Sequence, residues 1–225
     1  MAQLPTLGRG ALLCQRLSGL GNPGWKKVLE TTEFMAGMVV AQDSDGLIYR
    51  CDDSAQPVGL ALGSKITAFY NPVVNEEVTF DTLVQNLAHA NVQKVLVTNT
   101  STGLAYTVTT DYTISAVNGT ITRVALGSIA EDETVHVSYL YADPNKAGMD
   151  ETLPTGLISI ANNQGEISNL VYDTSNIIAV GDSLKCDADG FLSTDSSLTG
   201  KDVGYVTVAP TSDKPALVFM LDIEY

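Results

Sequence analysis

The feature that most constrains the fold is a pattern that occurs twice in this 225-residue chain. Residues 37–62 and residues 181–208 each begin with a glycine and continue with an Asp-x-Asp-Gly tetrapeptide, two apolar residues, a polar turn and a Val-Gly pair. The spacing between the tetrapeptide and the Val-Gly pair differs by one residue, which a loop can absorb. The repetition indicates an internal duplication and predicts that both copies fold into the same unit.

Each copy is typical of a strand, a tight hairpin, a second strand, a turn and a third strand. Asp-Gly readily adopts the positive φ angles of short hairpin turns, and the flanking residues have β propensity. A single unit of this size leaves a sheet edge open and its core half built. We therefore expect the two copies to combine into one small β-barrel or sandwich.

The tetrapeptides also resemble the beginning of a calcium-binding loop, with carboxylates at alternate positions before a glycine. An EF-hand loop requires an oxygen ligand at position 5 and a glutamate at position 12, between two helices. Counted from Asp187, these positions are Phe191 and Leu198, and counted from Asp43 they are Leu47 and Ser54. The hairpin interpretation is favoured, and weak surface binding of calcium stays open as an alternative.

The chain between the two copies is a run of strand-like segments. Asn118-Gly119 is its clearest hairpin signal. In "VHVSYLY" the residues alternate between a half-buried and a solvent face, with Val135, Val137, Tyr139 and Tyr141 on one and His136, Ser138 and Leu140 on the other. The segment "FDTLVQNLAHANV" fits either a short helix or a strand. From the strand count alone, we expect an immunoglobulin-like β-sandwich.

These patterns predict an all-β protein with three parts. Residues 1–36 form an extended N-terminal arm, residues 37–72 together with 148–225 form the duplicated β-barrel or sandwich, and residues 73–147 form the inserted immunoglobulin-like sandwich. Turn-forming residues at Asn71-Pro72 and in 142–156 predict the two linkers. The high Val, Thr and Ser content agrees with the all-β class.

Charge and cysteine content restrict the function. The net charge of −14 argues against binding to nucleic acid or to an anionic membrane. The arm is the exception, because residues 1–36 carry four basic and only two acidic side chains. Three cysteines without a CxxC pair predict reduced thiols rather than a disulfide framework or a zinc site. The arginines that interrupt the N-terminal apolar stretch argue against a signal peptide, so we expect synthesis in the cytoplasm.

No pattern for catalysis is apparent. The two histidines, His89 and His136, have no nucleophile motif near them, and the glycine-rich "SGLGNPG" lacks the Lys-Ser/Thr pair that grips phosphate. Paired carboxylates lie in predicted turns, where they are solvated. We therefore expect no enzymatic activity, no cofactor and no metal centre.

The repeated Gly…Asp-x-Asp-Gly…Val-Gly unit resembles the small β-barrel virion proteins of tailed bacteriophages, particularly capsid decoration (cement) proteins. "YTVTTDYTIS…NGTITRV…ETVHVSYLY" is similar to immunoglobulin-like or tail-tube-type domains of phage structural proteins. The resemblance implies a homotrimer on the outer capsid surface that binds the major capsid protein and stabilises the lattice. The arm would make this contact, through Arg9, Arg16, Trp25, Lys26 and Lys27.

Two other functions stay open. A tail-tube or neck subunit would share the β-rich architecture and form sixfold rings or tubes. A carbohydrate-binding module or adhesin could stack sugars on aromatic side chains, namely Trp25, Tyr106, Tyr112, Tyr139 and Tyr141. Tyrosines that alternate along strands belong more often to the core.

Overall fold

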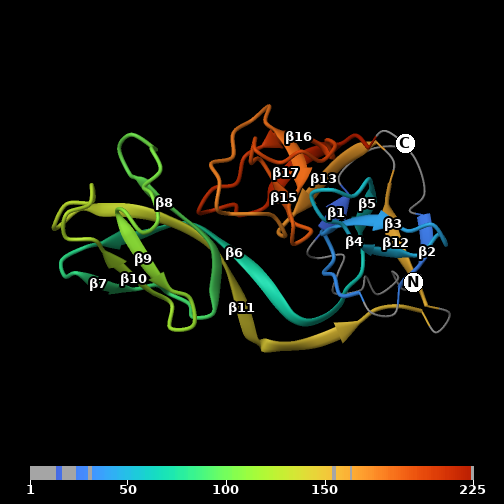
Figure 1. The fold of residues 1–225 in the computed structure, drawn as a ribbon, viewed down its shortest axis with the longest axis horizontal. Helices are drawn as coiled ribbons and strands as arrows, with labels where there is room; N and C mark the ends of the chain where they lie inside the picture. The colour runs from blue at the N-terminus through green and yellow to red at the C-terminus, as the bar shows by residue number, and fades with distance from the viewer. Residues whose placement is uncertain (1–13, 17–23, 30–31, 154–155, 163, 224–225) are drawn as a thin grey trace, which may run out of the picture.

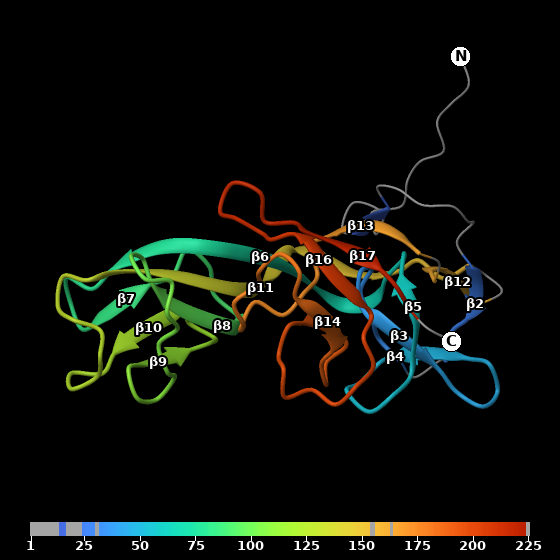
Figure 2. The same ribbon diagram turned by 90° about the horizontal axis from the view of Figure 1, so that it is seen from above.

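The computed structural model describes residues 14–16, 24–29, 32–153, 156–162 and 164–223, and every element in these ranges is a β-strand (Figure 1). The strands form four antiparallel sheets of six, five, three and three strands. The predicted all-β class is therefore confirmed. The molecule is elongated, with the two larger sheets forming a body at one end and the two smaller sheets forming a lobe at the other (Figures 1 and 2).

The body consists of the six-stranded and the five-stranded sheet. The six-stranded sheet has the order β1 (Cys14–Arg16), β13 (Gly165–Asn169), β17 (Leu217–Leu221), β16 (Gly204–Val208), β14 (Ser183–Cys186) and β15 (Leu192–Ser193). The five-stranded sheet has the order β2 (Gly24–Lys27), β12 (Leu157–Ala161), β5 (Pro57–Ala61), β3 (Val39–Gln42) and β4 (Ile48–Arg50).

The five-stranded sheet is buried on both faces. Successive side chains of a strand point to opposite faces, so Val39 and Ala41 of β3 face the six-stranded sheet, while Val40 faces the other way. The first face contributes to a core that it shares with β14, β16 and β17. The second face is covered by residues 34–38 and by side chains of the lobe's long strands. This position explains why β3 is apolar at consecutive positions rather than alternating.

The two copies of the repeated pattern have the same strand pairing. In the first, β3 pairs with β4 and β5, and in the second, β14 pairs with β15 and β16. In both hairpins the first aspartate accepts the backbone N–H groups two and four residues later, and the glycine has a positive φ of 80° or 84°. The predicted hairpins are confirmed, whereas the duplication of the whole domain stays a prediction.

The lobe consists of two three-stranded sheets around one core. The first has the order β6 (Lys65–Thr79), β11 (Thr134–Asp150) and β8 (Val92–Asn99), and the second has the order β7 (Val84–Asn86), β10 (Thr120–Arg123) and β9 (Tyr112–Ser115). Their shared core includes Phe80, Ile121 and Tyr139. β9 and β10 form the hairpin predicted at Asn118-Gly119, and β7 shows that "FDTLVQNLAHANV" contributes a strand. The immunoglobulin-like assignment stays a prediction.

Loops are not found at Asn71-Pro72 or at 142–150, because β6 runs through the first predicted linker and β11 runs through the second as far as Asp150 (Figure 2). Pro72 lies inside β6, where it opposes Leu140. A proline is tolerated there because β6 is an edge strand, so the missing N–H costs no hydrogen bond to a further strand. Pro144 lies in a register shift of β11, between Ala142 and Ala147, where the pairing is interrupted. Turn-forming residues therefore mark an edge and a bulge here, rather than two loops.

The alternation predicted for β11 is correct on one face only. Val135, Val137 and Tyr139 are buried in the lobe core as expected. Leu140, predicted to face solvent, is fully buried in the core of the body. The strand passes from the lobe to the body at this point, so both of its faces become covered.

Two glycines of the second copy, Gly181 at its start and Gly204 in its Val-Gly pair, predict a sharp difference between two substitutions. A Cβ at Gly204 would lie 2.0 Å from the carbonyl oxygen of Met220, whereas a Cβ at Gly181 would meet open space and only its φ of +93° would be strained. We expect Gly204→Ala to lower the free energy of unfolding by about 3 kcal/mol or more, and Gly181→Ala by about 1–2 kcal/mol. Urea denaturation measures both, and equal losses would contradict the packing described for β16 and β17.

Candidate functional site

The N-terminal segment contributes an edge strand to each sheet of the body. β1 pairs with β13 at the edge of the six-stranded sheet, and β2 pairs with β12 at the edge of the five-stranded sheet. An edge strand presents unpaired backbone groups along its free side and is a natural point for contact with another chain. The two strands cap β13 and β12, which would otherwise be edges.

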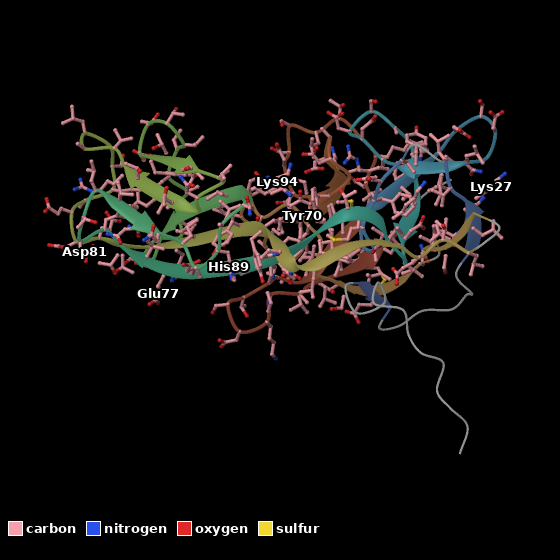
Figure 3. The ribbon with its side chains drawn as sticks, turned by 90° about the horizontal axis from the view of Figure 1, so that it is seen from below. Lys27, Tyr70, Glu77, Asp81, His89 and Lys94 are labelled. Carbon is pink, nitrogen blue, oxygen red and sulfur yellow. The ribbon has the colours of Figure 1, made fainter. Side chains whose placement is uncertain are left out.

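The residues predicted for the arm contact are divided by this arrangement. Trp25, Lys26 and Lys27 lie in β2, and Arg16 ends β1, while Arg9 lies outside the described residues. Lys26 is half-buried, with its Nζ 3.5 Å from Oε1 of Gln42, and Lys27 is exposed at the end of the body farthest from the lobe (Figure 3). A capsid contact by these residues stays a prediction.

A second site lies where the lobe meets the body, and its centre is Lys94 of β8 (Figure 3). Its Nζ is 2.8 Å from Oδ2 of Asp187 and 3.2 Å from Oδ2 of Asp189, the two aspartates of the second hairpin. The Nζ also lies 5.7 Å from the centre of the Phe191 ring, and that ring makes an edge contact with Tyr70 of β6. We call Lys94, Asp187 and Asp189 the latch.

Backbone geometry and hydrogen bonds hold the latch in position. Lys94 has a φ of 53°, which non-glycine residues rarely adopt, and its carbonyl oxygen accepts the hydroxyl of Thr174 at 2.6 Å. Asp187 is 6% exposed, and its Oδ1 accepts the N–H groups of Asp189 and Phe191. The second hairpin therefore uses one carboxylate oxygen to shape its own turn and the other to hold the lobe.

The electrostatics of the latch reflect its burial. Burial raises the pKa of Asp187 above its usual range, against the opposing effects of the Lys94 charge and of the backbone N–H donors. Burial lowers the pKa of Lys94, but the hydrogen bond and charge of Asp187, together with Asp173 and Asp189, outweigh burial and raise it. Lys94 is thus held in its charged form, and the carboxylate opposite it is partly desolvated.

The first hairpin has the same turn but no such partner. Asp43 Oδ1 accepts the N–H groups of Asp45 and Leu47, and neither aspartate forms an ion pair with any described residue. The structure gives no calcium-like arrangement to either copy: within the described ranges, no three His, Cys, Asp or Glu side chains are gathered to hold a metal ion. In the second hairpin, the ammonium group of Lys94 lies beside the two carboxylates that the sequence offered as possible cation ligands.

An open cleft of about 230 Å³ lies beside the latch, between the lobe and the body. β6, β8 and β11 line one side, and residues 172–178 with Pro210 line the other. Its polar groups include Asn75, whose backbone N–H donates to Ser138 at 3.0 Å. Tyr172 also lines the cleft, and its hydroxyl donates to the carbonyl of Pro215. Asn75 and Tyr172 therefore already have hydrogen-bond partners within the chain.

The two histidines lie on the lobe, without a nucleophile between them. His89 stacks on Tyr141, with ring centroids 3.7 Å apart, and makes an edge contact with Tyr139. His136 lies 3.8 Å from a carboxylate oxygen of Glu77 and lines the cleft. Both have ordinary structural contacts. No helix in the described ranges has the length and apolar character needed to cross a membrane.

Comparison with known proteins gives one informative similarity. Over 75 residues, 32% of this chain, the sequence is 40% identical to the tail sheath protein of Burkholderia phage BcepMu (isolate -/United States/Summer/2002). The aligned stretch covers 16% of that protein, so the chain is similar to only a small part of it. No family model matches the sequence, and no solved structure matches it.

The latch predicts a stability loss that depends on pH. We expect Lys94→Met to lower the free energy of unfolding by about 2–3 kcal/mol at pH 7, because it leaves Asp187 buried without a cation. A carboxyl whose folded pKa is raised favours folding when protonated, and that contribution disappears as the pH rises through the folded pKa. The difference between wild type and Lys94→Met should therefore shrink between pH 7 and pH 4.

Asp45→Asn is the matched control for Asp189→Asn, because the two residues occupy the same position in the two hairpins. Urea denaturation at both pH values should show a loss for Asp189→Asn and almost none for Asp45→Asn. A difference between wild type and Lys94→Met that grows at low pH would contradict the assignment of the latch.

Proposed function

We propose that this chain is a structural, non-enzymatic component of a bacteriophage virion and that it acts in the tail. The observation that carries the proposal is the 40% identity over 75 residues to a phage tail sheath protein. The all-β architecture supports it, since the chain has extensive sheet edges through which subunits can associate. The lack of a catalytic arrangement around His89 and His136 is consistent with a structural role.

We favour a location in the tail over one on the capsid surface because of the similarity to a tail sheath protein. The capsid decoration role implied by the resemblance of the repeated unit has no comparable match, although both roles belong to a phage particle. In the tail, the neighbours would be further copies of this chain and other tail proteins, in place of the major capsid protein.

The N-terminal edge strands are the proposed means of assembly. β1 and β2 are short, and among the described residues each pairs with one strand, β13 or β12. Lys26 and Lys27 add positive charge to the edge of a chain with a net charge of −14. An acidic neighbouring copy would be attracted to this edge, and the free side of β2 could add to its sheet.

We also propose that the body arose by duplication of a five-strand unit. The order β2-β12-β5-β3-β4 matches β13-β17-β16-β14-β15 strand for strand, if the lobe is an insertion between β5 and β12. The equivalent glycines also match: a Cβ at Gly59 would meet the carbonyl of Ala161, and one at Gly204 would meet that of Met220. A duplicated unit gives the body two similar edges and therefore two sites of association.

The location can be tested on the phage particles that carry this chain. Heads and tails are separated, and each fraction is analysed by quantitative mass spectrometry. We expect the chain to be recovered with the tails. Recovery with the heads would favour capsid decoration, and absence from both fractions would overturn the structural role.

The arm is tested by charge reversal in the same particles. We expect Lys26→Glu with Lys27→Glu to reduce incorporation into tails, because the edge loses its attraction for an acidic neighbour. Lys201→Glu with Lys214→Glu is the matched control, with the same change of charge at exposed lysines of the body. Equal incorporation of the two double variants would contradict the role of the arm, and circular dichroism checks that both are folded.

A further inference from the structure

Two cysteines far apart in the sequence meet between the sheets of the body. Cys51 directly follows β4 in the five-stranded sheet, and Cys186 is the last residue of β14 in the six-stranded sheet. Both are free thiols, they are 0% and 2% exposed, and they belong to the same core. The neighbouring Cys51 thiol raises the pKa of the Cys186 thiol.

The backbone around the two thiols fixes their proximity independently of the side chains. The N–H of Cys51 donates to the carbonyl of Val39 at 3.0 Å, and the N–H of Val39 donates to the carbonyl of Gly190 at 2.9 Å. A Cβ at Gly190 would lie 3.4 Å from the carbonyl oxygen of Cys51. Gly190 belongs to the hairpin that begins at Cys186, since its N–H donates to the carbonyl of Asp187. The segment after β4 is therefore held against the turn after β14.

The pair is protected while it is reduced. Each thiol donates to the carbonyl of the next residue, Asp52 or Asp187, at 3.3 Å. The contact with Cys51 and burial both raise the pKa of Cys186, so the reactive thiolate is scarce. Because both thiols are buried, neither would react with a large reagent unless the body opened locally. Once one thiol has reacted, the other is the nearest nucleophile.

We propose that Cys51 and Cys186 form a disulfide modification site, which closes when the folded protein meets a disulfide oxidant such as oxidised glutathione. One thiolate attacks the oxidant and forms a mixed disulfide with release of one glutathione thiolate. The second thiolate then displaces the other glutathione and completes the Cys51–Cys186 bond. In sum, the two protein thiols lose two protons and two electrons, and the oxidant gains them as two glutathione thiols.

The bond would join the two sheets and close a loop that contains the whole lobe. A cross-link over such a long loop restricts the unfolded chain more than the folded one, because the native backbone already brings its ends together. In the cytoplasm the glutathione pool keeps such a pair reduced, and an oxidising exterior allows it to close. The inference rests on the core of the body and does not depend on the proposed tail function.

The test uses the full chain with Cys14→Ser, so that only the two core cysteines remain. The folded protein is incubated with oxidised glutathione at pH 8, quenched with iodoacetamide and analysed by peptide mass spectrometry. We expect one peptide pair joined through Cys51 and Cys186, both thiols lost at the same rate, and a Tm that rises by about 10 °C and returns on reduction.

Three results would overturn the proposal. They are two thiols that stay free in the folded protein but react after denaturation, a stable glutathione adduct on a single cysteine, and a joined pair that lowers the Tm. The control is Cys51→Ser in the same background, which should show no rise in Tm with the oxidant. If the Cys51→Ser control folds poorly, the peptide mapping and the Tm of the Cys14→Ser protein still test whether the disulfide forms.

Discussion

The pairing of β6 with β11 is the constraint on which the arrangement of the molecule depends. Adjacent residues of β11 enter different cores, with Tyr139 in the lobe and Leu140 in the body. A register shift precedes each of these positions in one of the two strand pairings of β11, which allows the strand to turn its faces from one core to the next. The lobe is therefore an extension of the body's own chain pairing, and the ion pairs of Lys94 join it to the second hairpin.

The latch shows how one motif acquires two roles. Asp43 and Asp187 shape their turns with the same pair of backbone hydrogen bonds, so the local sequence determines the hairpin. Only the second hairpin lies beside the lobe, where Lys94 fills the space opposite its carboxylates. The resemblance to a calcium loop follows from the same chemistry, because alternate carboxylates before a glycine attract any cation that the fold brings near them.

The sequence predicted what depends on local patterns. The all-β class, both Asp-Gly hairpins and the Asn118-Gly119 hairpin follow from turn chemistry and β propensity. The predicted linkers failed because proline and asparagine are also tolerated at a strand edge and at a bulge. The solvent face predicted for Leu140 failed because alternation tells which residues share a face, but not whether a second core covers the other face.

The latch and the cysteine pair could not be predicted, because each depends on the packing of segments that are distant in sequence. Lys94 lies in the strand segment "VQKVLVTN", where nothing marks it as an ion-pair partner, and Cys51 and Cys186 do not occupy equivalent positions in the two repeated segments. A repeat places equivalent residues in equivalent sites, so it predicts contacts within each unit and not between units. The latch and the cysteine pair both lie outside a single unit. One joins the lobe to the second hairpin, and the other joins the two sheets that the hairpins begin to build.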